Sequence, residues 1–295
     1  MLLSGKPVNV ATVPQRSPFR YPGGKTWFVP FVRMWLHSLP RRPTLFVEPF
    51  AGGGIIGLTV AAERRAERVI LVELDEAVAS VWRTMLSADA GWLIARVLAF
   101  DVSRDSVERE LRRGARSDRE LAFQTLLRNR VQRAGIMAPG ASLVRRGENG
   151  RGLRSRWYPQ TLARRIQEIR DMRDRLEFIH GDGLEVIERL HRQEGCAFFV
   201  DPPYTAGGKR AGQRLYTHND VDHRRLFEIL SRAAGPVMMT YDESAEVLAL
   251  GRRYGFCAHL VPMKNAHHTT MRELVLTDAG SRLPAIQNAD PLLFD

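Results

Sequence analysis

Short apolar segments alternate with helical segments along most of this 295-residue chain. The segments that read as strands cover 44–50, 69–74, 177–180, 197–200, 237–241, 256–262 and 272–276. One helix is expected to begin at about 55, after the first strand, and another to end at about 98, after the second strand. Further helices are expected over about 103–130 and over 159–175, and a loop rich in Gly, Arg and Ser over 135–157. Strand–helix alternation predicts an α/β fold with a doubly wound, mostly parallel sheet.

The tetrapeptide Asp201-Pro202-Pro203-Tyr204 follows an apolar run, Cys196–Val200, that reads as a buried strand. Two prolines end the strand abruptly, because proline has no N–H to donate to a sheet. A carboxylate and an aromatic ring are thereby held on a stiff turn at the carboxyl edge of a strand, where open α/β sheets bind ligands. An amino-group methyltransferase needs these two groups, an acceptor for N–H and a flat surface for the ring. The alternative is an ordinary strand-ending turn.

The first predicted strand ends with Glu48–Phe50, and a glycine-rich turn, Ala51–Gly54, follows it. Glycines at a strand-to-helix turn let a ligand approach the backbone closely. Glu73 ends the second strand, where a carboxylate would accept hydrogen bonds from ribose hydroxyls. NAD and S-adenosylmethionine both carry that ribose, so these features do not separate the two cofactors. A carboxylate such as Glu48 near the turn would suit the positive charge of a sulfonium ligand.

Two further motifs each allow two interpretations. The glycine pair in Pro18–Lys25 is either a turn before a helix over 26–38 or a loop that folds over the cofactor. In the second case Lys25 would neutralise the cofactor's carboxylate and Tyr21 would pack beside it. Asp182 follows the third strand. It would either accept a hydrogen bond from the cofactor's adenine amino group or form the N-cap of the next helix.

Positive charge is concentrated in the middle of the chain. The net charge of +11 and the pI of about 10.4 favour a polyanionic partner, nucleic acid first. Residues 101–180 hold 19 Arg, no Lys and 11 acidic residues, which is most of that charge. The stretch from Arg128 to Arg156 contains eight arginines and a single acidic residue, Glu148. This pattern predicts a nucleic-acid surface, because arginine can bind phosphate or guanine through two hydrogen bonds.

Composition excludes several other classes of protein. Only Cys196 and Cys257 occur, so the sequence indicates neither a disulfide framework nor a zinc site, and we expect no metal. No apolar run approaches membrane-spanning length, and the N-terminus lacks the apolar core of a signal peptide. We therefore expect a cytoplasmic protein with no membrane partner.

Taken in order, these motifs resemble the Dam-like (D12 class) family of DNA adenine-N6 methyltransferases. The resemblance spans about residues 18–278 and is carried by Pro18–Lys25, Phe46–Gly54, Glu73, Asp201–Tyr204, Asn129-Arg130 and Arg156–Pro159. It implies a seven-stranded methyltransferase sheet whose last two strands form a hairpin, with S-adenosyl-L-methionine as cofactor. It also implies a monomer that flips adenine out of double-stranded DNA and methylates N6, with or without strong sequence specificity, as in DNA modification and restriction-modification systems. That the protein is prokaryotic or phage-encoded is implied only by this family resemblance.

The resemblance also implies a division of the chain and a set of site residues. The catalytic domain would comprise 18–99 and 176–278, the Arg-rich helical target-recognition insertion 100–175, and the tails 1–17 and 279–295. The catalytic residues would be Asp201, Pro202, Pro203 and Tyr204. The cofactor would be bound by Tyr21, Gly23, Gly24, Lys25, Glu48, Pro49, Phe50, Ala51, Gly52, Gly53, Gly54, Glu73, Asp182 and Asp201. DNA would be bound by Arg128, Asn129, Arg130, Arg133, Arg145, Arg146, Arg151, Arg154 and Arg156.

The chain departs from the family pattern at two places, and other functions stay open. Tyr21-Pro22 stands where the family usually has Trp-Ala, and Glu73 stands where it usually has Asp. The alternatives are an amino-methyltransferase that acts on RNA bases, a catalytically inactive DNA-binding relative, and an NAD-dependent oxidoreductase. The oxidoreductase would leave Asp201–Tyr204 without a use.

The C-terminal segment Asp290–Phe294 is apolar after a polar stretch. It resembles the short peptides that dock on bacterial sliding clamps, although Asp290 replaces their usual leading Gln. A sliding clamp is therefore one expected partner. The alternative is a tail that folds onto its own domain.

Overall fold

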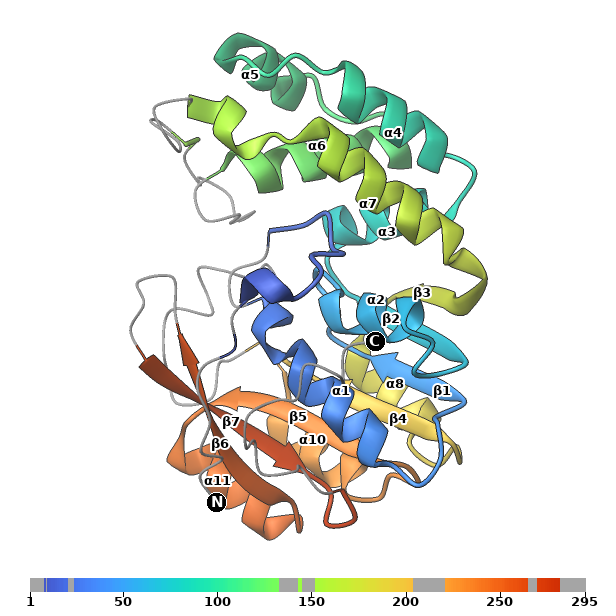
Figure 1. The fold of residues 1–295 in the computed structure, drawn as a ribbon, viewed down its shortest axis with the longest axis vertical. Helices are drawn as coiled ribbons and strands as arrows, with labels where there is room; N and C mark the ends of the chain where they lie inside the picture. The colour runs from blue at the N-terminus through green and yellow to red at the C-terminus, as the bar shows by residue number, and fades with distance from the viewer. Residues whose placement is uncertain are drawn as a thin grey trace.

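The computed structural model describes residues 8, 10–20, 24–132, 143–144, 152–203, 221–264 and 270–281. Within them, seven strands form one sheet in the order β3-β2-β1-β4-β5-β7-β6 (Figure 1). The strands are β1 (Leu45–Glu48), β2 (Arg68–Glu73), β3 (Leu176–His180), β4 (Cys196–Val200), β5 (Val237–Asp242), β6 (Cys257–Lys264) and β7 (Thr270–Thr277). The first five pair in parallel, whereas β7 pairs antiparallel with both β5 and β6. The predicted seven-stranded, mostly parallel sheet is confirmed.

Alternate residues of each strand enter two separate cores, because successive side chains of a strand point to opposite faces. On β1, Phe46 packs in one core, whereas Leu45 and Val47 pack in the other. The helices that contribute to the first core include α1 (Val29–Ser38) and α2 (Ile55–Ala62), and those that contribute to the second are α8 (Gly183–Leu190), α10 (His223–Leu230) and α11 (Ala245–Arg253). Burial on both faces explains why the central strand β4, Cys196–Val200, is a continuous apolar run in the sequence.

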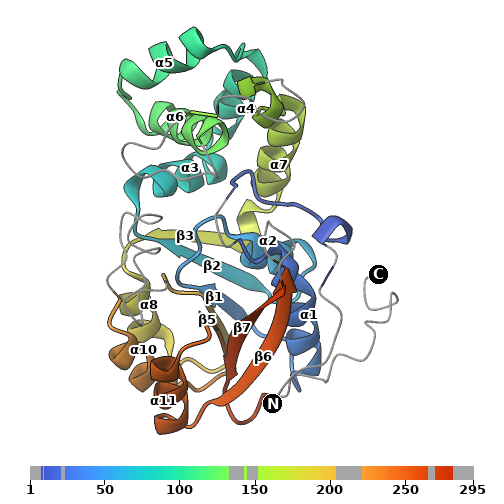
Figure 2. The same cartoon turned by 90° about the vertical axis from the view of Figure 1, so that its left-hand side faces the viewer.

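A group of further helices lies beyond the β3 edge of the sheet (Figures 1 and 2). They are α3 (Glu76–Leu86), α4 (Ala90–Ala99), α5 (Arg104–Arg112), α6 (Asp118–Val131) and α7 (Pro159–Asp171). Here α3 packs on α6, and α4 packs on both α6 and α7. No helix in the described part of the chain is long and apolar enough to span a bilayer.

The helix predicted over about 103–130 is two helices in the structure. After α5, Gly114 has a φ of +70°, a left-handed conformation that commonly ends a helix and that glycine adopts without strain. The helix predicted to run to about 98 is likewise divided, because α3 ends at Leu86 and α4 begins at Ala90. These breaks fold the Arg-rich segment back on itself as a compact helical layer.

The order of the strands brings the candidate residues to one place. Strand order reverses between β1 and β4, which are neighbours in the sheet although β2 and β3 come between them in the chain. At such a switch point the two following connections leave on opposite faces, and a crevice opens at the carboxyl ends of the strands. Glu48 ends β1, Glu73 ends β2, and Asp201 follows β4, so all three lie along this edge.

Candidate active site

The turn after β1 has a backbone that side chains other than glycine would strain. Gly52 and Gly54 have φ of 48° and 61°, and a Cβ on Gly54 would lie 2.7 Å from the ring of Trp82. The N–H of Ala51 donates to the carbonyl of Val72 at 2.9 Å, and the Trp82 indole donates to the carbonyl of Gly52 at 3.0 Å. The predicted Ala51–Gly54 turn is therefore fixed against β2 and α3 and leads directly into α2.

Glu73 lies against this turn and accepts three backbone hydrogen bonds. Its Oε2 accepts from the N–H of Gly52 at 3.0 Å, and its Oε1 accepts from Leu74 and Asp75, each at 2.9 Å. Burial raises the pKa of Glu73 to about 7, with the Asp75 charge adding to the rise and the N–H donors opposing it. The carboxylate expected to bind ribose is thus held in one orientation beside the glycines.

Glu48 is a buried carboxyl group at the end of β1. Its Oε2 accepts from the N–H of Gly57 at 2.7 Å, and a Cβ on Gly57 would lie 2.7 Å from that same oxygen. The pKa of Glu48 is raised to about 8, chiefly by burial; the Asp201 carboxylate adds to the rise and the N–H of Gly57 opposes it. The group is therefore largely protonated at neutral pH and would ionise most readily beside a bound cation.

Asp182 caps a helix next to the same turn. Its Oδ1 accepts from the N–H of Leu184 at 2.8 Å, which is the N-cap arrangement considered from the sequence. The first residue of α8, Gly183, is so close to Pro49 that a Cβ would lie 2.1 Å from the Pro49 carbonyl oxygen. Asp182 and the Glu48–Phe50 segment are thus neighbours, as a shared cofactor site requires.

Asp201 is held by two donors after β4. The hydroxyl of Thr240 donates to its Oδ1 at 2.7 Å, and the Nζ of Lys25 lies 3.0 Å from the same oxygen. Pro202 and Pro203 follow in the described chain, whereas Tyr204 lies outside the described residues. The structure thus brings the Pro18–Lys25 motif and the Asp-Pro-Pro motif into direct contact.

Lys25 also contacts an acid that the sequence did not single out. Its Nζ lies 2.9 Å from Oε1 of Glu273 on β7. Burial disfavours the charged ammonium, but Asp201 and Glu273 together outweigh burial and keep the pKa of Lys25 above its ordinary value. The sequence predicted that Lys25 would neutralise the cofactor's carboxylate, and in the structure its Nζ forms ion pairs with the carboxylates of Asp201 and Glu273. The one signal for Glu273 was an acid beside the apolar run Leu274–Leu276.

The remaining residues that were predicted to bind the cofactor divide into described and undescribed ones. Gly24 precedes the short 3₁₀ helix Lys25–Phe28, Ala51 is buried, and Phe50 is partly buried against the second core. Gly53 accepts a hydrogen bond on its carbonyl from the hydroxyl of Ser17. Tyr21 and Gly23 lie outside the described residues.

Asn129 on α6 connects the helical layer to the N-terminal segment. Its side chain is fully buried, its Oδ1 accepts from the N–H of Arg20 at 2.8 Å, and its Nδ2 donates to the carbonyl of Arg20 at 2.9 Å. In the structure Asn129 holds the backbone of Arg20, and its predicted contact with DNA stays a prediction. α7 adds a second link, because Arg165 donates to the carbonyl of Ser17 at 2.9 Å.

Arg130, the next residue on α6, is a buried cation with like-charged neighbours. It is 5% exposed, and its Nε has no hydrogen-bond partner. Its pKa is lowered to about 10, chiefly by burial and also by the charges of Arg20, Arg165 and Arg156. Among the described residues, no carboxylate forms an ion pair with it. We refer to Arg20, Arg130, Arg156 and Arg165 as the basic cluster.

The other predicted DNA-binding residues lie apart from this cluster or outside the described chain. Arg154 pairs with Asp101 at 3.2 Å on the surface, and Arg128 lies on α6 one position before Asn129. Arg133, Arg145, Arg146 and Arg151 lie outside the described residues. Arg20 and Arg165 were not among the residues selected from the sequence, because they lie outside the run of eight arginines.

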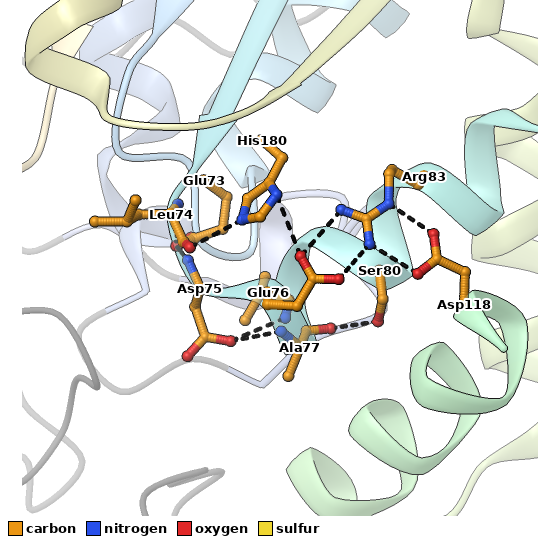
Figure 3. A network of polar contacts seen from close by, with 10 residues as sticks. Glu73, Leu74, Asp75, Glu76, Ala77, Ser80, Arg83, Asp118 and His180 are labelled. Atoms are coloured by element: carbon orange, nitrogen blue, oxygen red, sulfur yellow. Dashed lines mark hydrogen bonds and ion pairs between the residues drawn. The ribbon is translucent and has the colours of Figure 1, made fainter. Parts of the chain in front are cut away.

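Figure 3 shows a surface network that joins the end of β2 to the helical layer. His180 contacts Glu76 through Nδ1 at 3.2 Å and the Leu74 carbonyl through Nε2 at 3.1 Å. Arg83 of α3 bridges Glu76, at 2.6 Å, and Asp118 at the start of α6, at 2.7 Å. The network therefore links the residues just after Glu73 to the helix that carries Arg128–Arg130.

A comparison with protein families assigns the chain. The family described as D12 class N6 adenine-specific DNA methyltransferase matches residues 21–255, most of the chain. The chain belongs to this family. The D12-class assignment confirms the resemblance inferred from the motifs and makes the protein a DNA adenine-N6 methyltransferase with S-adenosylmethionine as cofactor. The described residues fit that cofactor. The glycine turn after β1 has no room for larger side chains, and the carboxyl groups of Glu48 and Glu73, both with a raised pKa, lie beside it.

Solved structures similar to this D12-class chain include other methyltransferases. The rRNA methyltransferase aviRa of Streptomyces viridochromogenes is 14% identical, with a TM-score of 0.39 and coverage of 90% of this chain and 88% of that one. A methyltransferase of Geobacter sulfurreducens is 14% identical, with a TM-score of 0.38 and coverage of 88% and 80%. A SAM-dependent methyltransferase of Agrobacterium tumefaciens is 10% identical, with a TM-score of 0.39 and coverage of 86% and 60%. A search of curated proteins gave no match.

Proposed function

We propose that this D12-class methyltransferase flips an adenine out of duplex DNA and methylates its N6 at Asp201-Pro202-Pro203-Tyr204. The observation that carries the proposal is the convergence on Asp201. The carboxylate lies at the switch point of the sheet, oriented by Thr240 and Lys25, beside the edge that carries Glu48 and Glu73. Flipping is required because N6 is paired inside the duplex, and it costs about a few kcal/mol.

The residues after β4 would act on the amino group by position and charge. Asp201 and the Pro202 carbonyl would accept the two N6–H bonds and draw the nitrogen toward tetrahedral geometry, which frees its lone pair for attack. No proton needs to leave before attack, because the carboxylate stabilises the positive charge that develops on nitrogen. Tyr204 would stack on the flipped base, and such stacking contributes about 1–3 kcal/mol per base.

The cofactor would lie along the edge formed by β1, β2 and the start of α8. Bound there, S-adenosylmethionine supplies an electrophilic methyl group on a sulfonium. Glu73 would accept the ribose hydroxyls, Glu48 would face the positive charge, and Asp182 would receive the adenine amino group. The left-handed glycines of the turn would let the ligand lie directly against the backbone.

Glu48 gives a prediction for pH. Glu48 has a folded-state pKa of about 8, above its ordinary value, so its contribution to the free energy of unfolding falls as pH rises toward about 8. A bound cation favours the ionised carboxylate and opposes this loss. The rise in Tm caused by S-adenosylmethionine should therefore be larger at about pH 8.5 than at about pH 6.5.

Differential scanning fluorimetry with and without cofactor measures this effect. The control is Glu48→Gln, whose amide oxygen can still accept from Gly57 but which cannot ionise, so any pH dependence that remains belongs to other groups. Equal Tm shifts at both pH values in the wild type would show that Glu48 does not contact the cofactor. A Tm shift that increases with pH in Glu48→Gln as much as in the wild type would show the same.

The basic cluster gives a second prediction, on DNA. A buried guanidinium without a carboxylate partner destabilises the free protein and suits a DNA phosphate. Arg130→Met should therefore stabilise the free protein by about 1 kcal/mol or more, a rise in Tm of about 2–4 °C. The same variant should bind DNA more weakly, and the plot of log K against log salt should be flatter by about 0.9 units.

Arg83→Met is the matched control for Arg130→Met, because Arg83 is an arginine with two carboxylate partners, Glu76 and Asp118. Its Tm should fall or stay unchanged. If Arg130→Met lowers Tm, or if its salt dependence equals that of the wild type, the cluster does not bind phosphate.

The direct test of function is transfer of labelled methyl to defined DNA duplexes, followed by analysis of the modified base. N6-methyladenine in DNA is the expected product. Methylcytosine would overturn the mechanism, and methylation of RNA in preference to DNA would overturn the substrate. Comparing duplexes of different sequence measures the degree of specificity and any restriction-modification site.

Three expectations concern the assembly of the protein and stay proposals. The division into a catalytic domain and an insertion over 100–175 rests on the family resemblance. The sliding-clamp contact through Asp290–Phe294 lies outside the described residues. We also propose that the protein acts as a cytoplasmic monomer.

A further inference from the structure

Glu273 brings the antiparallel end of the sheet into the active site. It lies on β7, opposite Asp242 of β5 and Val261 of β6, and its side chain is 5% exposed. Its Oε1 lies 2.9 Å from the Nζ of Lys25, whose side chain is 7% exposed. A buried carboxylate is costly without a partner, so this ion pair is a built feature of the site.

The ammonium of Lys25 lies between two carboxylates that come from distant parts of the chain. Asp201 is 3.0 Å from it and Glu273 is 2.9 Å from it. Lysine carries a flexible side chain whose charge is a compact point, so its position is set by the partners it meets.

The contacts of Asp201 show what the position of Lys25 controls. Both Thr240 and Lys25 are directed at Oδ1, so these two donors fix the direction in which the whole carboxylate points. Methyl transfer depends on that direction, because misplacing a reacting group by about 1 Å can cost about 10²-fold in rate.

We propose that Glu273 is a positioning residue for methyl transfer, which holds the charged Lys25 side chain against Asp201 and thereby orients the carboxylate toward the adenine amino group. This inference rests on the proposed function. Glu273 does not touch the reacting atoms; it acts through Lys25.

The test is Glu273→Gln, which keeps the shape of the side chain and removes its charge. The rate of methyl transfer in a single turnover on duplex DNA should fall by about 10–100-fold, as for the hydrogen-bonding partners of metal ligands. Lys25 stays buried but has lost one of its two carboxylates, so the variant should lose further activity as pH rises from about 7 to about 10. The wild type should show no such loss from Lys25 over this range.

Other titrating groups near the site are common to both proteins. Glu48 on β1 and Tyr241 on β5 interact electrostatically with Asp201, and neither is altered in the variant. The ratio of variant to wild-type rate at each pH therefore isolates Lys25. The matched control is Glu177→Gln on β3, an exposed glutamate that pairs with Arg68 and should leave the rate unchanged at every pH.

A double-mutant cycle separates positioning from a general structural effect. If Glu273 acts through Lys25, Lys25→Met with Glu273→Gln should be no slower than Lys25→Met alone. Additive losses, or a rate ratio that is constant with pH, would overturn the inference. If Glu273→Gln does not fold, Glu273→Asp keeps the charge and should show a lower rate with the wild-type pH profile; a wild-type rate would overturn the inference too.

The wild-type assay keeps the two hypotheses apart. If the wild type transfers no methyl to adenine in DNA, the proposed function fails, whatever the variants do. If the wild type is active and Glu273→Gln equals it at every pH, only the role of Glu273 fails.

Discussion

Asp201→Ala is expected to lower the single-turnover rate of adenine methylation by about 10²–10³-fold or more, the scale found when an enzyme loses one transition-state hydrogen bond. The variant removes the acceptor of the N6–H bond, so the nitrogen lone pair stays delocalised in the ring. Lys25 keeps its contact with Glu273, so the local fold should persist. Binding of cofactor and of DNA should change little, because neither depends on this carboxylate alone.

The rate should be measured by quenched-flow transfer of labelled methyl, with cofactor and DNA affinities measured separately. Asp201→Asn is the matched control for size. Its amide retains one oxygen but loses the negative charge, so it too should be strongly impaired. An Asp201→Ala enzyme with full activity would exclude the proposed mechanism. A variant that no longer binds cofactor would show that the main role of Asp201 is in cofactor binding and not in orienting the amino group.

Glu73→Ala should weaken the binding of S-adenosylmethionine by about 100-fold or more, from two charge-assisted hydrogen bonds to ribose at about 1.5 kcal/mol each or more. Glu73→Gln should be nearly as harmful. The carboxylate accepts from the N–H groups of Gly52, Leu74 and Asp75, and an amide nitrogen in the same position would face at least one of these donors.

Isothermal titration calorimetry measures both affinities. The control is Glu76→Gln, three residues further on, whose exposed carboxylate contacts Arg83 and His180. It should bind cofactor as the wild type does. If Glu73→Ala binds cofactor as tightly as the wild type, the ribose does not bind at the end of β2.

The strands and the local motifs could be predicted from the sequence because their physics is local. An apolar run that ends in Pro202-Pro203 can only be a strand followed by a turn, and glycines after Glu48 mark a backbone with positive φ. The parallel order then places Glu48, Glu73 and Asp201 at one edge without further information.

What could not be predicted depends on pairs of residues that are far apart in the chain. Glu273 meets Lys25 only because β7 inserts antiparallel beside β5, and no local pattern announces that contact. Asn129 was grouped with arginines by its position, although its amide pairs with a backbone 109 residues away. Arg165 joins the basic cluster through the same tertiary packing.

The link between Asn129 and Arg20 bears on how such enzymes can diversify. Residues 17–20 are fastened to α6 and α7, and five residues after Arg20 the same chain supplies the lysine that contacts Asp201. Helices α6 and α7, which we propose contact DNA, and the strands that carry the candidate site are therefore not independent modules. A recombination event that replaces the helices alone would remove the contacts of Asn129 with Arg20 and of Arg165 with Ser17, in the segment that precedes Lys25. On the proposal that α6 and α7 contact DNA, new sequence specificities are more accessible through point changes on the surface of these helices, or through exchange of the helices together with their matching N-terminal segment.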